Sequence, residues 1–126
     1  MLYINVNDVK ASIATGFNLQ TYIDEANDAV DDLAEEHGLY DKTLLKQPLP
    51  WRVKRYAVVY ALMRLCQDKI GSNNLDSIES EKYAVLYGVY RKELQEIRGD
   101  ISYEMLTGTV AKVRDRSINS NVIFRS

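Results

Sequence analysis

The chain has 126 residues, of which 46% are hydrophobic and 27% charged, and its formal net charge is −2. This length and composition predict one globular domain whose core needs no cross-link. The single cysteine, Cys66, excludes an internal disulfide and a multi-cysteine zinc site, and its apolar neighbours predict a buried side chain rather than a nucleophile. The longest apolar run, 56–63, is too short to span a membrane, and no secretory signal is visible, so we expect an intracellular protein.

A short helix is expected first. Asn5 or Asn7 can cap it, Val9 and Ile13 would point inward, and residues 15–16 (Thr-Gly) would end it.

Residues 18–37 predict a long amphipathic helix, with Asn18 as its N-cap and Gly38 as the left-handed residue after its last turn. Its other face carries seven acids and no lysine or arginine. Such a face is either solvated or a docking surface, and the sequence leaves both readings open. The inward residues recur at steps of three and four: Leu19, Ile23, Ala26, Val30 and Leu33.

The next segment, 39–49, reads as a loop that Pro48 and Pro50 stiffen. Pro50 can then begin a helix over 51–70, where the missing N–H costs nothing. Because the middle of this helix is apolar nearly all round, it should be the central and most buried one.

A third long helix is expected up to about Arg98, with Asp76 and Glu79 as a capping box. Gly88 in its middle suggests close packing against the central helix. Gly99-Asp100 should end it, and 101–106 can form one further turn. The sequence therefore predicts an all-α bundle of three long helices plus a short N-terminal helix over residues 1–108.

Residues 109–126 should form an extended C-terminal arm outside that domain. They combine apolar residues without a helical period with four basic residues against one acid, so we expect the arm to bind a partner. It can pair as a strand with a neighbour's arm or order only when bound. The expected partner-binding residues are Val110, Lys112, Val113, Arg114, Arg116, Ile118, Val122, Ile123, Phe124 and Arg125.

Groups suited to catalysis are few. The only histidine, His37, lies at a predicted helix end, and the sequence lacks phosphate-binding, nucleophile-elbow and zinc-protease motifs. We expect no enzyme, no cofactor and no metal. Acidic and basic segments lie apart, which suits docking between copies. The candidate subunit-interface residues are Asp24, Asp28, Asp31, Glu35, Trp51, Arg52 and Arg55.

Nine tyrosines against two phenylalanines favour contact surfaces. Four of these tyrosines fit the predicted core stripes poorly and are better candidates for an interface: Tyr3, Tyr22, Tyr40 and Tyr103.

The order of these elements resembles the head-to-tail connector proteins of tailed bacteriophages, also called adaptor or head-completion proteins. The likeness covers about residues 3–110. Four segments carry it: 22–31 (YIDEANDAVD), 47–50 (QPLP), 53–62 (VKRYAVVYAL) and 94–101 (LQEIRGDI).

This resemblance implies a structural subunit of the virion neck, present in the host cytoplasm during assembly. Copies would form a dodecameric ring between the portal protein and a tail or stopper protein, starting from a free monomer. DNA would pass through the ring without specific contacts, and no membrane would be involved. The alternatives are a small helical protein-binding or transcription-associated regulatory module, whose tail folds on a partner, and an enzyme with a divalent metal on the acidic helix.

Overall fold

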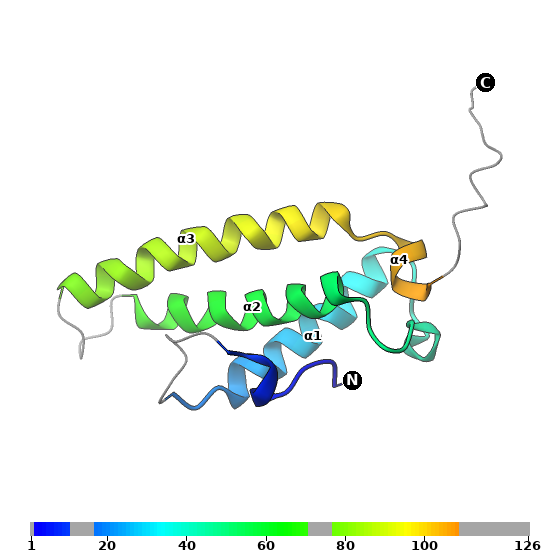
Figure 1. Cartoon of the computed structure of the whole chain (residues 1–126), viewed down its shortest axis with the longest axis horizontal. Helices are drawn as coiled ribbons and strands as arrows, with labels where there is room; N and C mark the ends of the chain where they lie inside the picture. Colours follow the sequence, from blue (N-terminus) through cyan, green and yellow to red (C-terminus); the bar gives the residue numbers. More distant parts are fainter. Residues whose placement is uncertain (1, 11–16, 71–76, 109–126) are drawn as a thin grey trace, which may run out of the picture.

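The computed structural model describes residues 2–10, 17–70 and 77–108, and these form an all-α fold with three long helices (Figure 1). The expected fold class is confirmed. The helical elements are η1 (Val6–Asp8), α1 (Gln20–Glu36), η3 (Lys42–Leu44), α2 (Trp51–Lys69), α3 (Ser77–Asp100) and α4 (Tyr103–Thr107).

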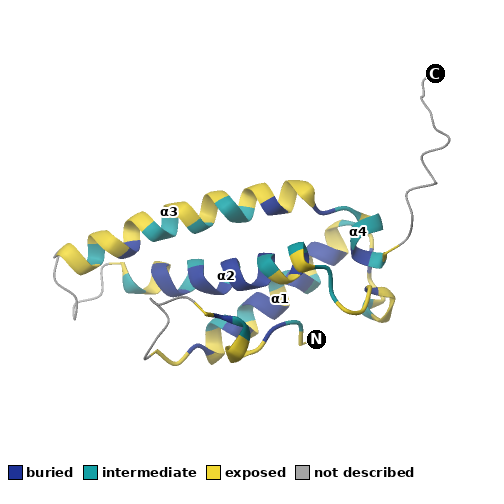
Figure 2. Ribbon diagram, in the orientation of Figure 1, coloured by how far each residue is buried: buried dark blue, intermediate teal, exposed yellow. Residues whose placement is uncertain are grey.

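The central helix is α2, which packs against both α1 and α3 (Figure 1). Its buried residues occur all round the helix, as the apolar sequence of this segment predicts. In Figure 2 the dark blue of buried residues lies mainly along α2 and α1. The buried residues of α2 are Val53, Tyr56, Ala57, Val58, Val59, Ala61, Leu62, Leu65 and Cys66.

The inward stripe predicted for α1 is confirmed, since Leu19, Ile23, Ala26, Val30 and Leu33 are all buried. The prediction that Gly38 is the left-handed residue after the last turn of α1 is also confirmed.

Gly38 has φ +84° and its N–H donates to Glu35 O, while Leu39 N–H donates to Ala34 O. This pair of bonds is a Schellman motif. At the other end, Asn18 Oδ1 accepts a hydrogen bond from Gln20 N, but Leu19 occupies the N-cap position.

The N-terminal helix is shorter than predicted. It is a single 3₁₀ turn, η1, because Val9 already has an extended backbone. Asn5 caps this turn through a reciprocal capping box with Asp8, and Val9 is buried as expected. Ile13 and residues 15–16 lie outside the described residues.

Residues 39–50 connect α1 to α2 and carry η3, which Asp41 caps through Thr43 N. Pro50 is the N-cap of α2 and Trp51 is the first helical residue, so the helix begins where the sequence predicts; it ends at Lys69, one residue before the predicted end. Lys46 N donates to Leu106 O at 2.8 Å, so this loop is hydrogen-bonded to α4.

Two expectations for α3 are wrong. Gly88 is exposed, and a Cβ added there would meet nothing within 4 Å, so it does not pack closely on α2. Gly99 and Asp100 belong to α3, which ends only after Asp100. The predicted further turn is α4, with Ser102 as N-cap and Gly108 in the left-handed conformation after it. Asp76, half of the expected capping box, is outside the described residues.

Candidate interaction surfaces

The described residues offer little catalytic chemistry. In the ranges 2–10, 17–70 and 77–108, no group of three or more His, Cys, Asp or Glu side chains could hold a metal ion. Cys66 is buried, and its burial raises the pKa of the thiol to about 11, so the reactive thiolate is rare near neutral pH. His37 is the half-buried C-cap of α1. Among the described helices, none has the length and hydropathy of a membrane span.

The acidic side of α1 is largely engaged within the chain. Of the four α1 residues predicted at a subunit interface, only Asp28 is exposed without a hydrogen bond or ion pair to another described residue. The other three have partners: Asp24 accepts from Gln20 (2.8 Å), Asp31 from Tyr3 (2.5 Å) and Glu35 from Lys42 (2.9 Å).

The basic start of α2 is neutralised in the same way. Arg55 makes two hydrogen bonds to Glu93 of α3, at 2.8 and 3.0 Å, and this pairing lowers the pKa of Glu93. Arg52 pairs with Asp100. These contacts join α2 to α3. Both arginines at the start of α2 therefore already have acidic partners within the same chain.

Helix α4, the 39–50 loop and the start of α2 lie at the same end of the fold (Figure 1), and each of them carries an exposed aromatic or apolar residue. We call this region the α4 end. Residues 109–126 continue the chain from it. Its large exposed side chains are Tyr40 (73%), Leu44 (54%), Trp51 (70%) and Tyr103 (40%).

Two tyrosines at the α4 end, Tyr40 and Tyr103, therefore fit the predicted role in an interface. Tyr3 and Tyr22 do not, because both are half-buried and pack against the hydrophobic core. Trp51 is the one large hydrophobic residue among the predicted subunit-interface residues, and it is strongly exposed. Arg52 stacks over its ring, with 5.1 Å between the guanidinium carbon and the ring centroid.

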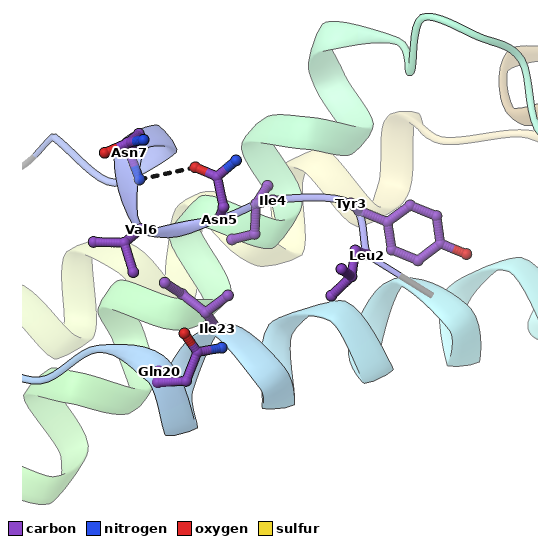
Figure 3. A pocket seen from close by; sticks show the side chains of 8 residues that line it. All are labelled: Leu2, Tyr3, Ile4, Asn5, Val6, Asn7, Gln20 and Ile23. Atoms are coloured by element: carbon purple, nitrogen blue, oxygen red, sulfur yellow. Dashed lines mark hydrogen bonds between the residues drawn. The ribbon is translucent and has the colours of Figure 1, made fainter.

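A hollow of about 400 Å³ lies between the N-terminal segment and the first turns of α1 (Figure 3). Ile4 and Ile23 form part of its wall, and Asn7 N donates to Asn5 Oδ1 beside it. The sequence analysis missed this feature.

Asn27 holds the segment that forms the hollow. It is a buried polar residue, and its Oδ1 accepts hydrogen bonds from Tyr3 N (2.9 Å) and Ile4 N (3.0 Å) while its Nδ2 donates to Ile4 O (3.3 Å). A signal was present in the sequence. Asn27 follows Ile23 by four residues and precedes Val30 by three, so it lies in the inward stripe of α1.

A second hollow, also about 400 Å³, lies between α2 and α3 and combines aromatic walls with two arginines. Arg98 is already engaged there, since it donates to Tyr56 Oη at 3.3 Å and pairs with Glu36. This leaves Arg91 as the arginine of the hollow without an ion pair to another described residue. The lining residues are Tyr56, Met63, Tyr87, Arg91, Leu94, Gln95 and Arg98.

The predicted partner-binding residues of the arm, from Val110 to Arg125, lie outside the described residues. The structure thus describes the surface beside the arm and not the arm itself. Comparison with known proteins finds no matching family model, no similar curated protein and no similar solved structure.

Proposed function

We propose that this protein is a structural subunit of a tailed-phage neck, forming a ring between the portal protein and a tail or stopper protein. The observation that carries the proposal is the α4 end. Four large apolar or aromatic side chains are exposed there, and the basic, apolar segment 109–126 follows α4 in the chain. Aromatic residues of this kind are enriched at protein–protein interfaces.

Two further features support an assembly role over a chemical one. The described residues form a hydrophobic core, and several of their surface charges form ion pairs within the chain. The resemblance in element order to head-to-tail connectors supplies the specific class of assembly. Under this proposal the α4 end and residues 109–126 together contact the portal, and DNA passes the ring without sequence-specific contacts.

The test uses capsids that carry the portal but lack tails, taken from the phage that encodes the chain. The purified protein is mixed with them, and bound protein is measured by sedimentation and seen as a ring by negative-stain electron microscopy. Removing residues 109–126 should leave the helical circular dichroism spectrum intact and abolish attachment. Trp51→Ala should weaken attachment at least tenfold if the α4 end is part of the contact.

Leu2→Ala is the matched control, because it also shortens a strongly exposed apolar side chain (84%), but on the N-terminal segment. It should attach like the unchanged protein. Normal attachment of the folded 1–108 fragment would contradict the role of the arm. Failure of the full chain to bind the capsids at all would contradict the neck function.

A further inference from the structure

Helix α3 has an exposed apolar stripe in addition to its core-facing one. Tyr83 and Ile97 are buried against the rest of the fold. Away from them lie Ile78, Val85 and Val89, which are 77%, 63% and 54% exposed. Their spacing of seven and four residues places them on one side of the helix. A solvated helix face is normally polar, so this stripe indicates a contact surface.

The same side of α3 carries small residues. Gly88 is exposed, does not have a positive φ, and has free space where a Cβ would be. Its helix-weakening effect therefore has no explanation in the packing of the described residues. Ala84, one turn earlier, is also exposed. Together they leave a shallow part of the surface where another helix can approach closely.

The positions on this side follow the spacing of a coiled-coil seam. From 78 to 95 the steps are three, four, three, four and three residues, which is the spacing of the contact positions in a coiled coil, and two of the six positions carry large apolar residues. The overlap is roughly 27 Å long at 1.5 Å per residue. The seam residues are Ile78, Glu81, Val85, Gly88, Lys92 and Gln95.

This seam is complementary to itself when a second copy lies antiparallel across it. With a twofold axis midway between positions 85 and 88, Val85 of one copy faces Gly88 of the other, so a large side chain meets a small one, and at the ends of the seam Ile78 faces Gln95. The same axis places Glu81 opposite Lys92. Both are exposed, and neither has a hydrogen bond or ion pair with another described residue. Each charge thus gains a partner of opposite sign.

We infer that a second copy of this chain docks on the seam, α3 against antiparallel α3, to form a twofold dimer of the free protein. A twofold contact uses the same surface on both copies, so the assembly is complete with two copies. It is therefore distinct from the head-to-tail contacts that a ring requires, and it does not rest on the proposed function. The seam has few large apolar residues, so the dimer should form in the micromolar range.

The first test is sedimentation equilibrium of the full chain between about 1 and 200 µM, where a monomer–dimer equilibrium is expected. Val85→Asp places a carboxylate in the seam twice per dimer and should weaken association at least 100-fold. Because Val85 is exposed, the variant should fold normally, which circular dichroism checks. Val6→Asp makes the same change at another exposed valine, on η1, and should leave the dimer unchanged.

A charge exchange tests the antiparallel register. Glu81→Lys and Lys92→Glu should each weaken the dimer several-fold, because each creates two like-charged pairs across the axis. The double variant restores opposite charges and should return the dissociation constant to within about twofold of the original. Its failure to do so overturns the register. A chain that is monomeric throughout the range, or that dimerises only without residues 109–126, overturns the proposal itself.

Discussion

Asn27 is the residue by which α1 holds the N-terminal segment, so its replacement provides a direct test of the fold. Asn27→Ala removes all three hydrogen bonds to the backbone of Tyr3 and Ile4. The N–H and C=O of Ile4, a residue only 3% exposed, then lose their partner. A buried polar group left unpaired costs about 1–3 kcal/mol.

The loss of stability in Asn27→Ala has an upper bound, because the N-terminal segment can detach from α1 instead of staying buried with its polar groups unpaired. Detachment exposes Ile4, whose burial stabilises the fold by about 1.5–3 kcal/mol, and part of Val9. Alanine also gains up to about 0.7 kcal/mol over asparagine in helix propensity. The expected net destabilisation by Asn27→Ala is therefore about 2–4 kcal/mol.

The assay is urea unfolding followed by circular dichroism at 222 nm, with hydrogen exchange of the Ile4 amide as a local probe. Asp28→Ala is the matched control, since it changes the next residue of α1 at an exposed position and gains similar propensity. It should lie within about 0.5 kcal/mol of the unchanged protein. Equal stability of the two variants, with Ile4 still protected in Asn27→Ala, would refute this account of how the N-terminal segment is held.

The remaining predictions concern a glycine, an ion pair and a thiol. Gly108→Ala forces a residue with a Cβ into φ +75° and towards the Lys46 side chain, and should lower the free energy of unfolding in urea by about 1–2 kcal/mol. Arg55→Gln should raise the pKa of Glu93, which the hydrogen bonds from Arg55 lower, as nuclear magnetic resonance titration can show. Because the folded pKa is depressed, the pair stabilises the fold above the ordinary carboxyl pKa of about 4.3. The stability difference from the unchanged protein should accordingly shrink as pH falls through the folded value, and a difference that grows on acidification would contradict it. Cys66, whose pKa is raised to about 11 by burial, should resist a thiol reagent at pH 8 in the folded protein and react at once in urea.

Local patterns in the sequence predicted the helices well, because the apolar residues that form each pattern are the residues that the helix buries in the fold. The apolar middle of α2 and the apolar stripe of α1 are both buried in the core. Gly38 is the residue that adopts the left-handed conformation at the end of α1, a requirement of that one turn. These features depend on residues within one helix. Fold class and helix order follow from them directly.

Features that depend on pairs distant in sequence were not predictable in the same way. Gly88 was expected to pack on α2, yet a Cβ there would meet nothing within 4 Å, because helical spacing places it on the side of α3 away from the buried Tyr83 and Ile97. Arg55 is hydrogen-bonded to Glu93, which lies thirty-eight residues away in the sequence, so no local pattern indicates the pair. At the α4 end the sequence indicated Trp51, Tyr40 and Tyr103 as contact candidates. It did not indicate Leu44, which is exposed because of how the 39–50 loop folds.

The hydrogen bond from Lys46 to Leu106 has a mechanical consequence. It fastens α4 to the loop before α2, and the aliphatic stem of Lys46 lies against Gly108, where the described part of the chain ends. A pulling force applied to whatever follows Gly108 is therefore shared between α4 and the 39–50 loop, and through that loop it reaches the central helix. Pulling α4 away from the subunit must therefore break its hydrogen bond to the 39–50 loop and expose the buried Leu106.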